Sequence, residues 1–99
     1  MEVKVLKEEN SIKVLIKGRI DSDTSPKLEK ELKKHVSKAS EMILDFEQVD
    51  YISSAGLRAI LAISKTLEHK KSSLTIINVS PVIAEVFDMT GFSELINIK

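Results

Sequence analysis

Apolar and polar residues alternate in two short runs near the start of the chain. In residues 3–6 and 12–16 apolar side chains alternate with lysine, and Glu9 and Asn10 lie between the two runs. Alternation with a period of two is typical of strands that bury one face, and a polar pair between two such runs is typical of a turn. The pattern therefore predicts an antiparallel β-hairpin with one covered face.

A first helix is predicted after the polar run at residues 21–25. Pro26 follows this run, and proline is favoured at the first position of a helix because its missing N–H would be unpaired there. We expect Thr24 or Ser25 to cap the helix. The apolar positions that follow recur at four-residue steps; they are Leu28, Leu32 and Val36.

Two further helices are predicted by the same spacing. The second runs from Ser54 to about His69, with apolar residues on one stripe: Leu57, Ile60, Leu61 and Leu67. The third begins after Ser80 and Pro81 and ends at Gly91, since glycine is the residue most often found just past a helix end. Its apolar stripe is Val82, Ile83, Val86 and Phe87.

Three more apolar runs have the length of strands, at residues 42–46, 74–79 and 95–98. The order strand-strand-helix-strand-helix-strand-helix-strand repeats a unit whose crossover is right-handed in about 98% of known cases. We therefore expect one α/β domain over residues 1–99, with a mixed, mostly parallel sheet of about five strands and helices mainly on one face. Functional loops of such sheets follow the strands' carboxyl ends, here at residues 21–25 and 47–56.

Length and charge exclude several classes of function. A chain of 99 residues owns a single core and no deep enclosed cavity, which disfavours most self-sufficient enzymes. Its 15 Lys and Arg balance 15 Asp and Glu, and only 4% of its residues are aromatic. Nucleic-acid binders need a basic surface or stacking aromatics, so direct binding of DNA or RNA is not expected.

The absence of cysteine also restricts the chemistry. It removes disulfides, thiolate metal sites and cysteine nucleophiles, and it fits a reducing compartment, so we expect a cytoplasmic protein. No stretch approaches 18 apolar residues, and the first residues lack the pattern of a signal peptide, so membrane insertion is not expected. A monomer without cofactor or metal is the simplest expectation. His35 and His69 are interpreted as solvated helix residues, not metal ligands.

Asp21-Ser22-Asp23-Thr24 is the first candidate for chemistry. It has the outline of the motif of aspartate-based phosphotransferases, in which one carboxylate attacks and a second handles protons. The alternative is a polar turn that caps the following helix. A magnesium-dependent phosphotransferase using Asp21 or Asp23 therefore stays open as a hypothesis, as does a binding role for Asp21.

The second candidate is the pair Ser53 and Ser54, where a loop is predicted to become a helix. A helix N-terminus favours anions through its dipole and its unpaired N–H groups, so it would receive a phosphoryl group well. The alternative is that one serine simply caps the helix. A serine hydrolase is not expected, because the elbow glycine pattern and an oriented histidine are missing.

A third candidate surrounds Gly91. Two interpretations fit the apolar residues Phe87, Met89 and Phe92: an adaptable, exposed contact surface, or part of the core. For Phe87, core packing is the stronger interpretation.

Three motifs in order resemble the STAS domain family, and the bacterial anti-sigma factor antagonists in particular. Residues 49–58, Val-Asp-Tyr-Ile-Ser-Ser-Ala-Gly-Leu-Arg, resemble the family's signature loop. Residues 18–21, Gly-Arg-Ile-Asp, are similar to its Gly-x-Leu/Ile-Asp. Residues 80–81 and 87–92 are similar to its Ser-Pro followed by Phe-Asp-Met-Ser/Thr-Gly. The resemblance covers essentially the whole chain.

The resemblance implies a protein-binding switch and not an enzyme. In this family the unmodified protein binds an anti-sigma factor, itself a serine kinase, and so frees a sigma factor for transcription. Phosphorylation ends the binding and a serine phosphatase restores it. Counted back from Gly56, the phosphorylated position falls on Ser54. Many members carry Asp directly before it, where this chain has Ser53, so modification of Ser53 stays open.

The resemblance also assigns a partner-binding surface and leaves one alternative function. The positions assigned to partner binding are Asp21, Ser53, Ser54, Gly56, Leu57, Arg58, Met89, Thr90 and Gly91. The alternative is a non-phosphorylated adaptor STAS domain in a transport or other signalling complex.

Overall fold

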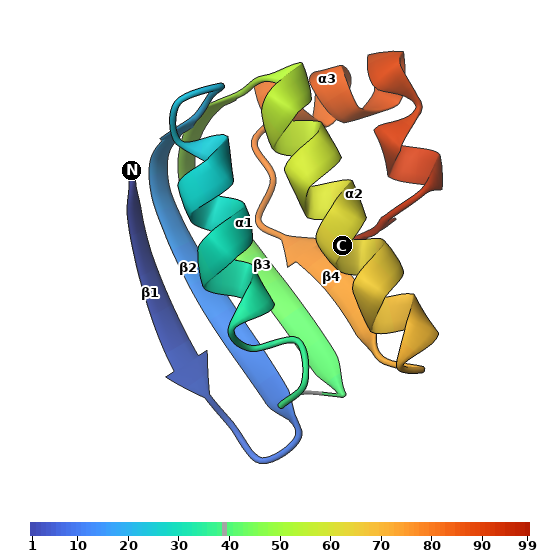
Figure 1. Ribbon diagram of the computed structural model, residues 1–99. Helices are drawn as coiled ribbons and strands as arrows, with labels where there is room; N and C mark the ends of the chain where they lie inside the picture. Colours follow the sequence, from blue (N-terminus) through green and yellow to red (C-terminus); the bar gives the residue numbers. More distant parts are fainter. Residues whose placement is uncertain (39) are drawn as a thin grey trace.

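The computed structural model describes residues 1–38 and 40–99, which form one sheet flanked by helices (Figure 1). In chain order the elements are β1 (Glu2–Lys7), β2 (Ser11–Ile20), α1 (Ser25–Lys33), β3 (Glu41–Ile52), α2 (Ser54–His69), β4 (Ser73–Ile77), α3 (Pro81–Thr90), a 3₁₀ turn (Phe92–Glu94) and β5 (Asn97–Ile98).

The sheet has the strand order β1-β2-β3-β4-β5. β1 is antiparallel to β2, and every other neighbouring pair is parallel. Figure 1 shows α1 and α2 lying side by side across one face of the sheet, and these two helices are in contact. The predicted fold class is therefore confirmed. Strands β2, β3 and β4 lead into α1, α2 and α3 at one end of the sheet, which we call the carboxyl edge.

The core lies between the sheet and the helices. Alternate residues of β2 and β3 face it and are fully or almost fully buried: Ile12, Val14, Ile16, Met42, Leu44 and Phe46. Phe87 of α3 joins them, with its ring centroid 6.0 Å from that of Phe46 and 4.8 Å from that of Phe92. Phe87 and Phe92 are thus core residues, whereas Met89 is 79% exposed.

Element boundaries differ from prediction where the sheet is irregular. Leu15 pairs with Asp45 but Lys17 pairs with Gln48, so β3 carries an extra residue there and continues beyond Phe46. The predicted functional loop 47–56 is consequently wrong: it is strand as far as Ile52, and a single residue separates β3 from α2. The residues after Phe46 include polar ones that interrupt the apolar pattern, so the pattern did not predict that β3 continues.

Helix α1 is shorter than its apolar stripe predicts. It ends at Lys33, and Val36 follows in a turn while still packing against the core. His35 lies in this turn as well, and its side chain is only 12% exposed, so its interpretation as a solvated helix residue is wrong. His69 is exposed at the end of α2, as expected.

Asp45 holds the irregular part of β3 in place, although it is a buried carboxylate at 8% exposure. Its Oδ1 accepts hydrogen bonds from the N–H of Glu47 at 2.9 Å and from Nδ2 of Asn78 at 3.2 Å. Nζ of Lys13 lies 3.9 Å from its Oδ2. One carboxylate thereby ties together β2, β3 and the segment after β4.

We expect Asp45→Ala to destabilise the protein by about 2 kcal/mol, because two donors and a cation lose their acceptor. In a domain of this size that is a fall in melting temperature of roughly 8–16 °C. Differential scanning calorimetry measures it, with exposed Glu47→Ala as the control at a cost below about 0.5 kcal/mol. Equal melting temperatures for the two variants would show that Asp45 does not organise β3.

Candidate functional site

The junction between β3 and α2 separates the roles of the two adjacent serines. Ser53 has extended backbone angles (φ −95°, ψ 170°), and its Oγ accepts a hydrogen bond from the N–H of Gly56 at 3.2 Å. Its own N–H donates to the carbonyl oxygen of Ile20 at 2.8 Å. Ser53 is therefore the N-cap of α2. Ser54 is the first residue of α2 and is exposed.

Gly56 allows α2 to approach the end of β2 closely. A Cβ atom at this position would lie 2.7 Å from Cγ2 of Ile20 and 2.9 Å from Cγ1 of Ile52. Both distances are shorter than side-chain carbons tolerate, so only glycine fits without a shift. The close approach places Ser53, whose N–H donates to the carbonyl oxygen of Ile20, beside the loop that begins at Asp21.

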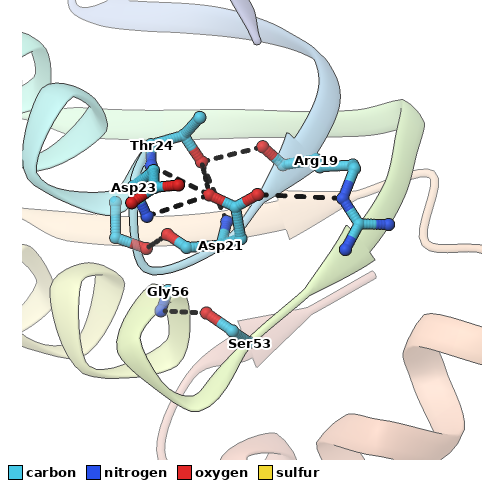
Figure 2. Close-up of polar contacts among 7 residues, drawn as sticks. Arg19, Asp21, Asp23, Thr24, Ser53 and Gly56 are labelled. Carbon is cyan, nitrogen blue, oxygen red and sulfur yellow. Dashed lines mark hydrogen bonds and ion pairs between the residues drawn. The ribbon is translucent and has the colours of Figure 1, made fainter.

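Asp21 folds the loop between β2 and α1 around its own carboxylate (Figure 2). Its Oδ1 accepts hydrogen bonds from the N–H groups of Asp23 and Thr24, both at 3.0 Å, and lies 3.1 Å from Oγ1 of Thr24. Oδ2 lies 3.7 Å from Nε of Arg19. Because these contacts occupy both oxygens, the structure favours a turn-forming role over that of a phosphotransferase nucleophile.

The expected N-cap position of α1 is confirmed at Thr24, but the expected side-chain cap does not form. Thr24 occupies the N-cap position but makes no capping hydrogen bond, and its backbone is already helical (φ −91°, ψ −22°). Its Oγ1 accepts from the N–H of Asp21 and donates to the carbonyl oxygen of Arg19, both at 2.8 Å. Oγ of Ser25 donates to the carbonyl oxygen of Asp21. The carboxylate of Asp21 has taken over the part that sequence assigned to these hydroxyls.

The same contacts perturb the acidity of Asp21. The hydrogen bond from the N–H of Thr24 is the largest cause that holds the pKa of Asp21 below its ordinary value of 3.8. Partial burial acts in the opposite direction, whereas the Thr24 hydroxyl, the N–H of Asp23 and the charge of Arg19 lower the pKa further.

We expect the carboxyl carbon of Asp21 to titrate below pH 3.8 in ¹³C NMR, and its midpoint to rise in Thr24→Val. A pKa that is lower in the folded state gives stability that is complete above the unfolded value and is lost as pH falls through the folded value. Asp21→Asn should lack this acid-dependent loss. A wild-type midpoint at or above 3.8 would contradict the hydrogen bonding described.

Arg19 and Tyr51 are site neighbours that the sequence analysis missed. The Arg19 guanidinium carbon lies 4.2 Å from the centroid of the Tyr51 ring, and both side chains are substantially exposed. The two residues are register partners on β2 and β3 only because of irregularities between Leu15 and Lys17 and between Gly18 and Arg19. Sequence periodicity carries no signal for this pairing.

The remaining candidate residues are of two kinds: buried residues that position α2, and exposed residues that a partner can reach. Gly56 and Leu57 are buried, so they position α2 and present no side chain to a partner. Arg58 is exposed and lines a groove of about 250 Å³ between the start of α1 and the start of α2. Met89 to Gly91 lie at the far end of α3, which at ten residues is about 15 Å long.

The turn at the end of α3 is well formed. Gly91 adopts a left-handed conformation (φ 77°) and ends the helix as predicted, and Oγ1 of Thr90 donates to the carbonyl oxygen of Val86 at 2.8 Å. Among residues 1–38 and 40–99, no hydrogen bond or ion pair joins this turn to Ser53 or Ser54. The structure thus brings Asp21, the two serines and Arg58 to the carboxyl edge, whereas Met89 to Gly91 lie at the end of α3 that is remote from β4.

Within residues 1–38 and 40–99, no group of three or more His, Asp or Glu side chains is arranged to hold a metal ion. No helix there has the length and apolar character needed to cross a membrane.

Comparison with protein families matches the chain to the STAS domain model over residues 3–99. Among curated proteins, the chain is 37% identical to BtrV of Bordetella bronchiseptica over 78 residues, covering 78% of this chain and 67% of BtrV. It is 30% identical to the anti-sigma-B factor antagonist of Bacillus subtilis over 99 residues, covering 100% of this chain and 91% of that protein.

Solved structures share the fold. The chain matches an anti-sigma factor antagonist from Mycobacterium paratuberculosis with a TM-score of 0.88 at 21% identity, covering 98% of this chain and 83% of that one. It matches the anti-sigma factor antagonist SpoIIAA, solved in its unphosphorylated form, with a TM-score of 0.77 at 15% identity, covering 99% and 87%. A SpoIIAA structure in the phosphorylated form matches with a TM-score of 0.76 at 16% identity, covering 99% and 91%.

Proposed function

The chain belongs to the STAS domain family, and we propose that it is an anti-sigma factor antagonist whose binding is ended by phosphorylation of Ser54. Similarity to the Bacillus subtilis antagonist along the whole chain supports the antagonist role. The observation that carries the choice of residue is the exposed position of Ser54, at the start of α2 and directly after a serine that is already engaged.

The structure favours Ser54 over Ser53 as the phosphorylated residue. The half-buried Ser53 uses its Oγ to hold the N–H of Gly56, so phosphorylation there would break the cap of α2. Oγ of Ser54 makes no hydrogen bond within the described residues, and its side chain faces solvent. Serine and aspartate are both good N-caps, so Ser53 can replace the aspartate found in many relatives without loss of the cap.

The physical basis of the switch is a large local charge. A kinase transfers the terminal phosphoryl group of ATP to Oγ of Ser54, ADP leaves, and the hydroxyl proton is released. The product carries about −1.5 to −2 charges at neutral pH, at the same end of the sheet as Asp21 and in the proposed contact surface. Desolvating that charge in an interface, without a matching cation, is strongly unfavourable.

The proposed contact surface is centred on the carboxyl edge. Asp21, Ser54 and Arg58 present exposed or partly exposed groups there, while Ser53, Gly56 and Leu57 hold α2 in position. The turn formed by Met89, Thr90 and Gly91 is a second, separate contact for the same partner. In this proposal the partners are an anti-sigma factor that is a serine kinase and a phosphatase that reverses the modification.

The proposal also includes where the protein acts and in what form. The whole chain, residues 1–99, acts as one domain in the cytoplasm and as a monomer. It controls transcription indirectly, by protein binding, and uses neither a cofactor nor a metal.

Phosphorylation mapping tests the proposal. Wild type, Ser53→Ala and Ser54→Ala are incubated with ATP and the cognate kinase, and the phosphate is located by mass spectrometry. We expect one phosphate on Ser54 in wild type and in Ser53→Ala, and none in Ser54→Ala. Phosphate on Ser53 would show that the neighbouring serine is the modified residue. Binding of partners with no phosphate on either serine would favour a non-phosphorylated adaptor domain.

A further inference from the structure

Arg58 is an exposed cation with no assigned partner in the fold. Within residues 1–38 and 40–99 its side chain makes no ion pair and no hydrogen bond. Two nearby cations are already paired: Arg19 with Asp21, and Lys33 of α1 with Glu29 at 3.3 Å. The guanidinium of Arg58 is therefore free to take a new anion.

The geometry of α2 places Arg58 next to Ser54. The two residues are four apart, and residues at this spacing lie on one face of a helix with Cβ atoms about 5–6 Å from each other. Gly56, midway between them, faces the core and contacts Ile20 and Ile52. Ser54 and Arg58 therefore share the face turned away from the sheet, and both are exposed.

Arg19 is the alternative arginine at the carboxyl edge, and it is already held. Its Nε lies 3.7 Å from Oδ2 of Asp21 (Figure 2). Its guanidinium carbon lies 4.2 Å from the centroid of the Tyr51 ring. A phosphate would have to displace both contacts to recruit it. Arg58 gives up no such contact.

Several acidic groups lie at the same end of the molecule as Ser54. Asp21 and Asp23 belong to the loop before α1, and Asp50 lies near the end of β3. Glu29 of α1 lines the same groove as Arg58 but is paired with Lys33. A phosphoryl group on Ser54 would thus meet repulsion from the loop and attraction from one residue of its own helix.

We propose that Arg58 binds the phosphoryl group of phosphorylated Ser54 within the same molecule, through a bidentate guanidinium–phosphate contact across one turn of α2. The inference rests on the proposed function for its choice of Ser54. It adds a second effect of phosphorylation: the modification introduces negative charge and also withdraws a free arginine from the contact surface. Arginine suits this role because its planar fork matches phosphate oxygens.

The test uses the full chain with phosphoserine incorporated at position 54 during translation, so it needs neither kinase nor partner. The second ionisation of the phosphate is followed by ³¹P NMR in the phosphorylated forms of wild type, Arg58→Gln, Arg19→Gln and Lys65→Gln. Each variant loses one positive charge, and Lys65 is an exposed residue further along α2.

Pairing with Arg58 stabilises the dianion, so the phosphate pKa should rise by about 0.15–0.4 in Arg58→Gln. It should change by less than about 0.1 in Lys65→Gln, whose charge lies several turns away. An equal rise in Lys65→Gln would show a general charge effect and overturn the proposal. A rise confined to Arg19→Gln would assign the phosphate to Arg19. Absence of kinase modification in the mapping experiment would refute the proposed function and leave this result standing.

Discussion

Replacing Gly56 with alanine is expected to lower the melting temperature by about 5–15 °C, the equivalent of about 1–2 kcal/mol in a domain of this size. The added Cβ would lie 2.7 Å and 2.9 Å from the side chains of Ile20 and Ile52, and 3.3 Å from the carbonyl oxygen of Ile20. The isoleucines are almost fully buried and the carbonyl belongs to the backbone, so α2 itself must shift.

Helix propensity alone predicts the opposite sign, which makes this substitution informative. Alanine is more favourable than glycine inside a helix by about 1 kcal/mol. Ala62→Gly is the reverse substitution at an exposed position of the same helix. It measures helix propensity alone and should destabilise the protein by about this amount. Thermal unfolding followed by circular dichroism compares the two. A Gly56→Ala protein as stable as wild type would contradict the close packing of α2 on β2.

Replacing Ser54 with aspartate is expected to weaken binding of the anti-sigma factor about 100-fold, or about 3 kcal/mol. The substitution places a charge at an exposed position that the proposed interface covers, where desolvating it is costly. Isothermal titration calorimetry with the purified partner measures the change. A single carboxylate supplies less charge than a phosphate, so the loss is a lower bound for the modified protein.

Two controls test whether the loss of binding comes from the charge of aspartate, from its size, or from a charge anywhere on α2. Ser54→Asn has the size of aspartate without its charge and should bind within about tenfold of wild type. Ala62→Asp adds the same charge two turns further along α2, where the interface is not expected to reach. A Ser54→Asn protein that binds as weakly as Ser54→Asp would indicate a steric effect and remove the electrostatic basis of the switch.

The fold followed from the sequence wherever the periodicity was simple. The stripe of α2 gave its bounds from Ser54 to His69, and the Ser80-Pro81 and Gly91 signals bracketed α3. Prediction failed where a tertiary contact replaced a local rule. The irregular pairing near Asp45 extended β3 through residues that read as a polar loop, because the carboxylate of Asp45 satisfies the backbone there.

The candidate site was predicted in outline and not in its roles. Sequence alone left open which serine caps α2, and the hydrogen bond from Gly56 to Ser53 decides this. It assigned capping of α1 to Thr24 or Ser25, whereas the carboxylate of Asp21 organises that turn. The stacking of Arg19 on Tyr51 depends on strand register, which a sequence pattern does not carry.

The central claim is that phosphorylation of Ser54 ends binding to an anti-sigma factor. Its most direct test is calorimetric titration of the purified partner with unmodified protein and with protein carrying phosphoserine at position 54. We predict that the modified protein binds at least 100-fold more weakly, a difference of about 3 kcal/mol. Affinities for the two forms that agree within threefold would contradict the claim.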